Sequence, residues 1–216
     1  MIRLIDGMDY TNHGDELDQM FRLRKRVFAD RLKWDVGTFG YYEIDDYDMR
    51  RPLYVLAMDG TGKQVLGSLR LLPTTGPNML ADTFYDLLPE GKPIRSPLIW
   101  ESSRYCVDTE AASAMGSKGL SYTTGELLLA LCEVGMNAGL QSIVTVIDMR
   151  MERILRRLKC MGERIGEPRV YGNVTALAGF WETSSEMLQE LRVNTGINES
   201  VLESSMAKIE PLNQVA

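Results

Sequence analysis

One turn between two strand-like segments constrains the fold of this chain most strongly. The apolar segments LYVLAMD (53–59) and QVLGSLRLLP (64–73) are joined by Asp59-Gly60-Thr61-Gly62, which is the pattern of a β-hairpin. A hairpin requires antiparallel neighbours, so the sheet that contains it cannot be wholly parallel.

Helix-like and strand-like segments alternate around this hairpin. The residues predicted to be helical are 15–31, 80–88, 149–161 and a segment from a capping box at Thr123 and Glu126 up to Gly139. Further strands are predicted at 1–6, 98–107, 142–148 and up to about residue 180, with a loop at 109–118 and a weakly helical tail. Hairpin and crossover connections together predict a mixed-sheet α/β (α+β) fold, and 216 residues suit one domain over 1–216.

The composition excludes several classes of function. The net charge of −6 argues against a nucleic-acid partner. The single histidine, His13, is expected in a solvated loop, and one imidazole cannot build a histidine-rich metal site. Neither a G-x-G-x-x-G motif nor a P-loop is present. We therefore expect carboxylates, arginines and backbone groups to carry the chemistry, without a metal.

The sequence also predicts a cellular compartment. The longest apolar run, Leu127 to Cys132, has six residues, against about 20 for a membrane span. The first residues do not resemble a signal peptide. Three widely spaced cysteines predict no disulfide framework. We expect a cytoplasmic protein with no membrane partner.

The densest functional signal lies in the long loop predicted at 33–52. Its segment from Glu43 to Asp48 holds four carboxylates in six residues, and four aromatic side chains precede it, at Trp34, Phe39, Tyr41 and Tyr42. Crowded carboxylates repel one another and attract cations. A solvated loop would explain the acidic run alone, whereas the aromatic residues favour a walled polar pocket.

Arginines in the predicted helix and strands can neutralise this acidic segment. Arg24 lies in the first predicted helix, and Arg70 and Arg104 lie inside predicted strands, the latter near Glu101. Arginines in strands are more often paired than free, because burial of an unpaired charge is costly.

Two further signals are a basic helix and an apolar set. From Arg150 to Lys159 there are five positive residues and one negative, a local net charge of +4. This predicts either a solvated face or a docking site for an acidic partner. The apolar set predicts either ordinary core or the lining of a flexible acyl chain, and its members are Met79, Leu80, Phe84, Met115, Met149 and Met151.

At these residues the sequence resembles the LuxI-type acyl-homoserine-lactone synthases of quorum sensing. The matching motifs are RKRVF (24–28), Trp34, Glu43-x-Asp45-x-x-Asp48, Gly67-x-x-Arg70, Thr75-Gly76-Pro77, Phe84 and Trp100-Glu101-x-Ser103-Arg104. The segments ESSRYCVDT, IVTVIDMRMERILRR and IGEP resemble the rhizobial branch, which favours medium-chain 3-oxo-acyl products. The last forty residues match weakly.

The resemblance implies a GNAT-like N-acyltransferase fold and a two-step reaction. The amine of S-adenosylmethionine (SAM) attacks an acyl thioester, and the methionyl carboxylate then displaces methylthioadenosine to close the lactone. SAM is a substrate, so no cofactor is implied. The usual donor in the family is an acylated carrier protein, with acyl-CoA as the alternative, and the G-x-G/A pyrophosphate loop of acetyl-CoA-dependent N-acetyltransferases is not visible.

The resemblance also implies roles for individual residues. The catalytic set is Arg24, Glu43, Asp45, Arg70, Glu101 and Ser103, with Glu43 as a base acting through water. The SAM-binding set is Phe28, Trp34, Asp48 and Arg104, with Arg104 on the SAM carboxylate. The acyl pocket is Met79, Phe84, Thr145 and Met149, and the carrier-docking set is Arg150, Arg153, Arg156, Arg157 and Lys159. Thr145 either bonds a 3-oxo group or simply fills a strand.

Overall fold

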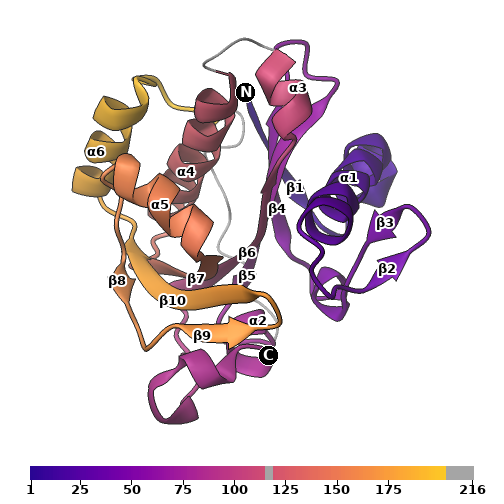
Figure 1. Ribbon diagram of the computed structural model, residues 1–216. Coiled ribbons are helices and arrows are strands. Elements are labelled where there is room, and N and C mark those ends of the chain that lie inside the picture. The colour runs from indigo at the N-terminus through magenta and orange to yellow at the C-terminus, as the bar shows by residue number, and fades with distance from the viewer. Residues whose placement is uncertain (115–118, 203–216) are drawn as a thin grey trace.

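The fold of this computed structural model is described for residues 1–114 and 119–202. Within these ranges one eight-stranded sheet has helices on both faces (Figure 1). Its strand order is β1-β4-β5-β6-β7-β10-β8, with β9 added to β10. The strands are β1 (Ile2–Asp6), β4 (Leu53–Met58), β5 (Val65–Pro73), β6 (Ile99–Val107), β7 (Ser142–Asp148), β8 (Glu163–Arg164), β9 (Arg169–Tyr171) and β10 (Val174–Glu182).

The sheet is mixed, as the hairpin pattern predicts. All named pairs are antiparallel except β6 and β7, which run parallel. Their pairing ends at Ser102 and Thr145, although β6 continues to Val107 and β7 to Asp148. The two strands therefore separate beyond this pair and leave a splayed edge in the middle of the sheet.

The first helix begins earlier than the apolar spacing predicts. Helix α1 (Tyr10–Lys25) is capped by Asp9, which accepts from the Asn12 N–H at 3.3 Å, and continues as a π-helical turn over Arg26–Arg31. The expectation that His13 lies in a solvated loop is wrong. It lies inside α1, in a non-helical backbone conformation, and is partly buried.

The remaining helices correct three further predictions. They are α2 (Met79–Asp82), α3 (Thr109–Ala114), α4 (Gly119–Asn137), α5 (Met149–Arg157) and α6 (Ser185–Thr195). The predicted loop at 109–118 contains α3. Asp108 caps this helix by accepting from the Ala111 N–H at 3.0 Å, and the alanines of α3 favour a helix. The predicted capping box at Thr123 lies inside α4, and α5 ends before Lys159.

The predicted loop at 33–52 contains short regular elements. Strands β2 (Thr38–Phe39) and β3 (Tyr42–Glu43) form a hairpin whose turn includes Gly40 at φ 58°. A 3-10 helical turn follows over Asp46–Met49. In Figure 1 this segment lies beside α1, on the opposite side of the sheet from α4, α5 and α6.

Alternation along β4 shows how the sheet separates two cores. Leu53, Val55 and Ala57 join the large core against α4, whereas Tyr54, Leu56 and Met58 join the core against α1. A third apolar cluster connects the segment after β5 with β7 and β10. No helix in the described ranges is both long enough and apolar enough to cross a bilayer.

Candidate functional site

The centre of the candidate site is Asp48, a fully buried carboxylate on the α1 face of the sheet. Arg24 donates to both of its oxygens, at 2.8 and 2.9 Å, and Arg70 Nη1 donates at 2.7 Å. Burial alone would raise the pKa of Asp48, but the two guanidinium groups outweigh it and hold this pKa well below its usual range. The carboxylate is therefore held ionised between α1 and β5.

Glu43 and Asp45 extend this network toward Arg104 on β6. Glu43 accepts from Arg24 Nε at 2.5 Å and from Arg104 Nε at 2.9 Å, so both of its oxygens are occupied. Asp45 accepts from Arg70 Nη1 at 2.5 Å and forms an ion pair with Arg104 Nη2 at 2.8 Å. The structure thus brings together three arginines and three carboxylates that lie up to 80 residues apart (Arg104 minus Arg24).

Two local backbone features position these side chains. Asp45 caps the 3-10 turn by accepting from the Tyr47 N–H at 2.9 Å, and Asp48 accepts from the Asp45 N–H at 2.9 Å. On β6, Arg104 has φ 54°. Two residues lie between Ser103 and Cys106, whereas only Leu69 lies between Arg70 and Ser68, the residues of β5 that pair with them. This bulge turns Arg104 toward the α1 face.

Glu101 is a buried carboxyl without an arginine partner among the described residues. It accepts from the backbone N–H groups of Met79 and Leu80, at 3.0 and 2.5 Å, at the start of α2. Burial raises the pKa of Glu101 to about 7, and the two N–H donors only partly oppose this effect. Ser103, two residues on, accepts from Arg70 Nε at 3.1 Å.

Aromatic side chains border the Arg104 end of the network. The rings of Phe28 and Trp34 stack with centroids 5.2 Å apart and an interplanar angle of 20°. The Arg104 guanidinium lies 5.7 Å from the centroid of the Phe28 ring. The predicted aromatic wall is therefore next to the predicted arginine.

The predicted acyl-pocket residues do not form one cluster. Phe84 packs edge-on against Tyr171 at 5.0 Å, within the cluster that includes Val144. Thr145 follows Val144 in β7 and so points to the other face of the sheet. Met79 turns its sulfur to Arg70 Nη2 and Arg104 Nη1, at 3.3 and 3.2 Å.

Of the other four members of the predicted apolar set, Leu80 is buried in the cluster that includes Val144, and Met151 is partly buried on α5. Met149 is partly buried at the first residue of α5, and Met115 lies outside the described residues.

The predicted docking residues are all exposed. They are Arg150, Arg153, Arg156 and Arg157 on α5, and Lys159 just beyond it. The acidic residue of this helix, Glu152, is buried and accepts from Arg164 Nε at 3.1 Å. The positive charge of α5 is therefore presented to solvent.

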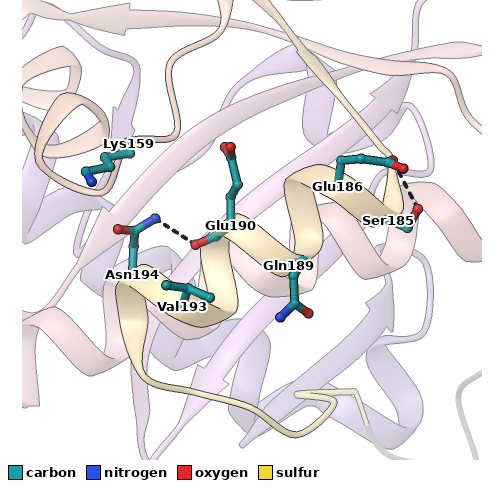
Figure 2. Close-up of a pocket in the computed structure, with 7 residues that line it drawn as sticks. All are labelled: Lys159, Ser185, Glu186, Gln189, Glu190, Val193 and Asn194. Carbon is teal, nitrogen blue, oxygen red and sulfur yellow. Dashed lines mark hydrogen bonds between the residues drawn. The ribbon is translucent and has the colours of Figure 1, made fainter.

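A hollow lined mostly by α6 contains none of the residues of this network. It has a volume of about 550 Å³, and its lining consists of Lys159, Ser185, Glu186, Gln189, Glu190, Val193 and Asn194 (Figure 2). All but Lys159 belong to α6, and the Asn194 side chain donates to the Glu190 carbonyl at 2.8 Å (Figure 2). None of these residues belongs to the predicted SAM or acyl sets, so the hollow is not part of the candidate site.

Sequence reasoning missed two tyrosines of the network. The Tyr54 hydroxyl donates to Asp48 at 2.7 Å, and the Tyr47 ring lies 5.5 Å from the Arg70 guanidinium. The hairpin turn contained the signal for Tyr54, because its register places Tyr54 directly opposite Arg70. Tyr47 lies within the acidic segment itself.

A mixed sheet splayed at one parallel pair, with a polar site beside the splay, defines an N-acyltransferase-like protein. The fold alone is shared with an acyl-CoA N-acyltransferase from Pseudomonas aeruginosa, at 14% identity and TM-score 0.51, over 84% of this chain and 98% of that one. The family model described as autoinducer synthase matches residues 9–191, and the chain belongs to this family.

Individual relatives agree with this assignment. The chain is 42% identical over 170 residues to an acyl-homoserine-lactone synthase of Agrobacterium fabrum, covering 79% of this chain and 80% of that one. Its structure resembles the CoA-dependent acyl-homoserine lactone synthase MesI, with 26% identity, TM-score 0.81, and coverage of 94% and 100%. It also resembles the synthase LasI, with 31% identity, TM-score 0.76, and coverage of 88% and 93%.

A further relative, BjaI, was solved with SAM and isopentyl-CoA, and has 26% identity, TM-score 0.80, and coverage of 93% and 91%. The predictions of a GNAT-like fold and of an acyl-homoserine-lactone synthase of the LuxI type are confirmed. The chain is thus an acyltransferase.

Proposed function

We propose that the network on the α1 face binds SAM and that α5 receives an acyl-carrier protein bearing a medium-length, 3-oxo-type chain. The observation that supports the SAM site is the difference in solvent exposure among the side chains of the network. Asp45 and Arg104 are 15% and 10% exposed, whereas Arg24, Glu43, Asp48 and Arg70 are at most 1% exposed. The two partly exposed members are the ones that a substrate can contact.

The exposed pair matches the charges of SAM. The Arg104 guanidinium can bind the SAM carboxylate bidentately, and Asp45 can face the cationic ammonium and sulfonium end. The Phe28–Trp34 stack supplies aromatic faces for the sulfonium. The buried members, Arg24, Asp48 and Arg70, would then hold this pair in place rather than touch SAM.

The first step needs a proton acceptor for the SAM ammonium. Glu43 and Glu101 are both buried and both have their two oxygens occupied, but Glu43 accepts from two charged guanidinium groups, which repel an incoming proton, whereas Glu101 accepts from two neutral backbone N–H groups. Glu101 has a pKa of about 7, which is better matched to proton transfer near neutral pH. We assign proton acceptance to Glu101 and the positioning of Arg24 and Arg104 to Glu43.

The second step needs little more than correct placement. The SAM carboxylate attacks its own γ-carbon, and methylthioadenosine leaves as a neutral molecule, so no general acid or base is required. Fixing the carboxylate at Arg104 and the sulfonium at the aromatic stack supplies that placement. No resident cofactor is needed for either step.

The choice of donor rests on α5. Its exposed arginines carry positive charge in a chain of net charge −6, which would steer an acidic carrier protein to this face. Acyl-CoA is the second candidate, favoured by the likeness to the CoA-dependent synthases MesI and BjaI.

A single assay tests the reaction and the donor together. The purified protein is incubated with SAM and, in parallel, with carrier-bound and CoA-bound acyl groups, and products are measured by mass spectrometry. We expect acyl-homoserine lactone and methylthioadenosine in equal amounts, with the carrier-bound donor preferred. Faster turnover of acyl-CoA would assign the donor to CoA, and free CoA without methylthioadenosine would contradict the SAM site.

Variants then test the residue assignments. Arg104→Ala should abolish lactone formation. Glu101→Gln should remove the acidic limb of the pH–rate profile, whereas Glu43→Gln should lower kcat without moving that limb. Retained activity in both Arg104→Ala and Glu43→Gln would overturn the site.

We also propose that residues 1–216 act as one domain in the cytoplasm. Cys106, Cys132 and Cys160 are free and buried, as a reducing compartment would keep them.

A further inference from the structure

Two hydroxyl-bearing side chains lie on the α4 face of the sheet, where β6 and β7 separate. In β7, Ile143 joins the α4-side core and Val144 the opposite cluster, so Thr145 faces α4. Its cross-strand partner is Gly179, where an added Cβ would meet the Trp181 ring of the α4-side core. Tyr105, three residues beyond Ser102 in β6, packs against the same core.

The hydroxyl proton of Thr145 is already used. Thr145 Oγ1 donates to the Ser102 carbonyl at 2.7 Å, across the last pair of the parallel ladder. A hydroxyl has one proton, so Thr145 keeps only acceptor capacity in this arrangement. A 3-oxo group is purely an acceptor and cannot bond to it.

The hydroxyl of Tyr105 is an unused donor on that face. Its oxygen is shielded from solvent and has no hydrogen-bond partner in the part of the chain that the structure describes. Thr124, on α4, is near enough to affect the pKa of Tyr105, but the two hydroxyl groups do not form a hydrogen bond of normal geometry. A buried phenol without a partner costs stability, so its retention calls for a use outside the free protein.

We propose that the Tyr105 hydroxyl is a specificity determinant for the acyl group and donates a hydrogen bond to an oxygen atom on the acyl chain. The ligand class is an acyl thioester with a carbonyl or hydroxyl oxygen near its thioester end. This inference rests on the proposed function. Three residues of strand span at most about 11 Å, so a chain that passes between the splayed strands near Thr145 comes within reach of Tyr105.

The two hydroxyl groups together define what the site selects. Tyr105 can donate to a 3-oxo or a 3-hydroxy oxygen, and Thr145 can accept only from the latter. An unsubstituted chain leaves the phenol unpaired, as it is in the free protein. One neutral hydrogen bond corresponds to a preference of about five- to tenfold for the oxygenated chain.

The test is Tyr105→Phe, which removes one oxygen and keeps the ring. We measure kcat/KM of the full-length enzyme with SAM and two carrier-bound donors of equal length, octanoyl and 3-oxo-octanoyl. The ratio of 3-oxo-octanoyl to octanoyl should fall about five- to tenfold in the variant. The Tm of the free protein should stay the same or rise, because the removed hydroxyl has no partner there.

Controls separate this role from a structural one. Thr124→Val removes the α4 hydroxyl that affects the pKa of Tyr105, and Tyr122→Phe makes the same chemical change at an exposed position of α4; both should keep the wild-type ratio. An unchanged ratio in Tyr105→Phe overturns the proposal, and a lower Tm with an unchanged ratio identifies a structural hydroxyl instead. Lactone formation by the wild type from octanoyl donor shows that the proposed function stands, so a flat ratio then counts against Tyr105 alone. If the wild type forms no lactone from either donor, both the proposed function and the role of Tyr105 are contradicted.

Discussion

Two regions of this synthase, the buried network and helix α5, place their arginines in opposite environments. In the network, Arg24 and Arg70 are at most 1% exposed, and Glu43, Asp45 and Asp48 each lie at hydrogen-bond distance from at least one of them. On α5, Arg153 and Arg157 are exposed, and none of the described residues forms an ion pair with them. In the first region the positive charges are fixed in ion pairs, whereas in the second they face solvent and create a local positive potential.

The difference follows from the dielectric environment. A buried ion pair is worth keeping only when each charge is matched, and loss of one partner leaves the other uncompensated. An exposed arginine loses little when its neighbours change, because water and salt screen it. Under the proposed function, the same residue type would therefore fix SAM-binding groups in one place and steer a partner in the other.

The largest expected effect comes from removing a buried arginine. Arg70→Met leaves Asp45 with Arg104 and Asp48 with Arg24 as their only arginine partners, and should lower the free energy of unfolding by about 3–5 kcal/mol. Arg153→Met, the same change on α5, should shift it by less than about 0.5 kcal/mol. Urea denaturation measures the free energy of unfolding of both variants. Equal losses in the two variants would contradict the difference between buried and exposed arginines.

Glu101 sharpens the comparison, because it is buried without an arginine. Its pKa is about 7 in the folded protein against an ordinary 4.5, so the folded state binds more protons between these pH values. The free energy of unfolding should fall by about 3 kcal/mol as pH rises from about 4.5 to about 7. Asp48, whose pKa is lowered, should lose its contribution only as pH falls into the acidic range.

Glu101→Gln isolates this contribution. The variant should show a flatter stability profile between pH 4.5 and 7, measured by urea denaturation at several pH values. A wild-type slope that survives unchanged in the variant would show that another group titrates in this window.

The smallest effect is expected on α5. Reversing the charge at Arg153 and Arg157 should raise KM for the acyl-carrier protein about tenfold at low salt, with a smaller change as salt is added. KM for SAM should not change. Lys63→Glu with Lys92→Glu alters the net charge equally at exposed sites away from α5 and serves as the control. An equal rise of KM in the control would leave only a general charge effect.

Patterns of neighbouring residues predicted much of the fold. The turn from Asp59 to Gly62 and the apolar runs around it predicted the β4–β5 hairpin, and its register places Tyr54 opposite Arg70. Helix boundaries were predicted less well: α1 starts at Tyr10 because Asp9 caps it, and α3 was missed. Such ends depend on single capping contacts rather than on a repeated pattern.

The sequence alone determined which chemical groups are present and which family they indicate. The acidic segment, the strand arginines and the single histidine pointed to charge pairing rather than histidine chemistry, and the motifs that contain these residues indicated the family that the family model confirms. Only the tertiary structure decided how those groups are used. Whether Glu43 faces water or two guanidinium groups, and whether Thr145 or Tyr105 retains a free proton, depends on contacts between residues 19 to 61 positions apart. Hydrogen bonds are directional and of short range, so pairing across that distance is settled by packing and not by spacing along the chain.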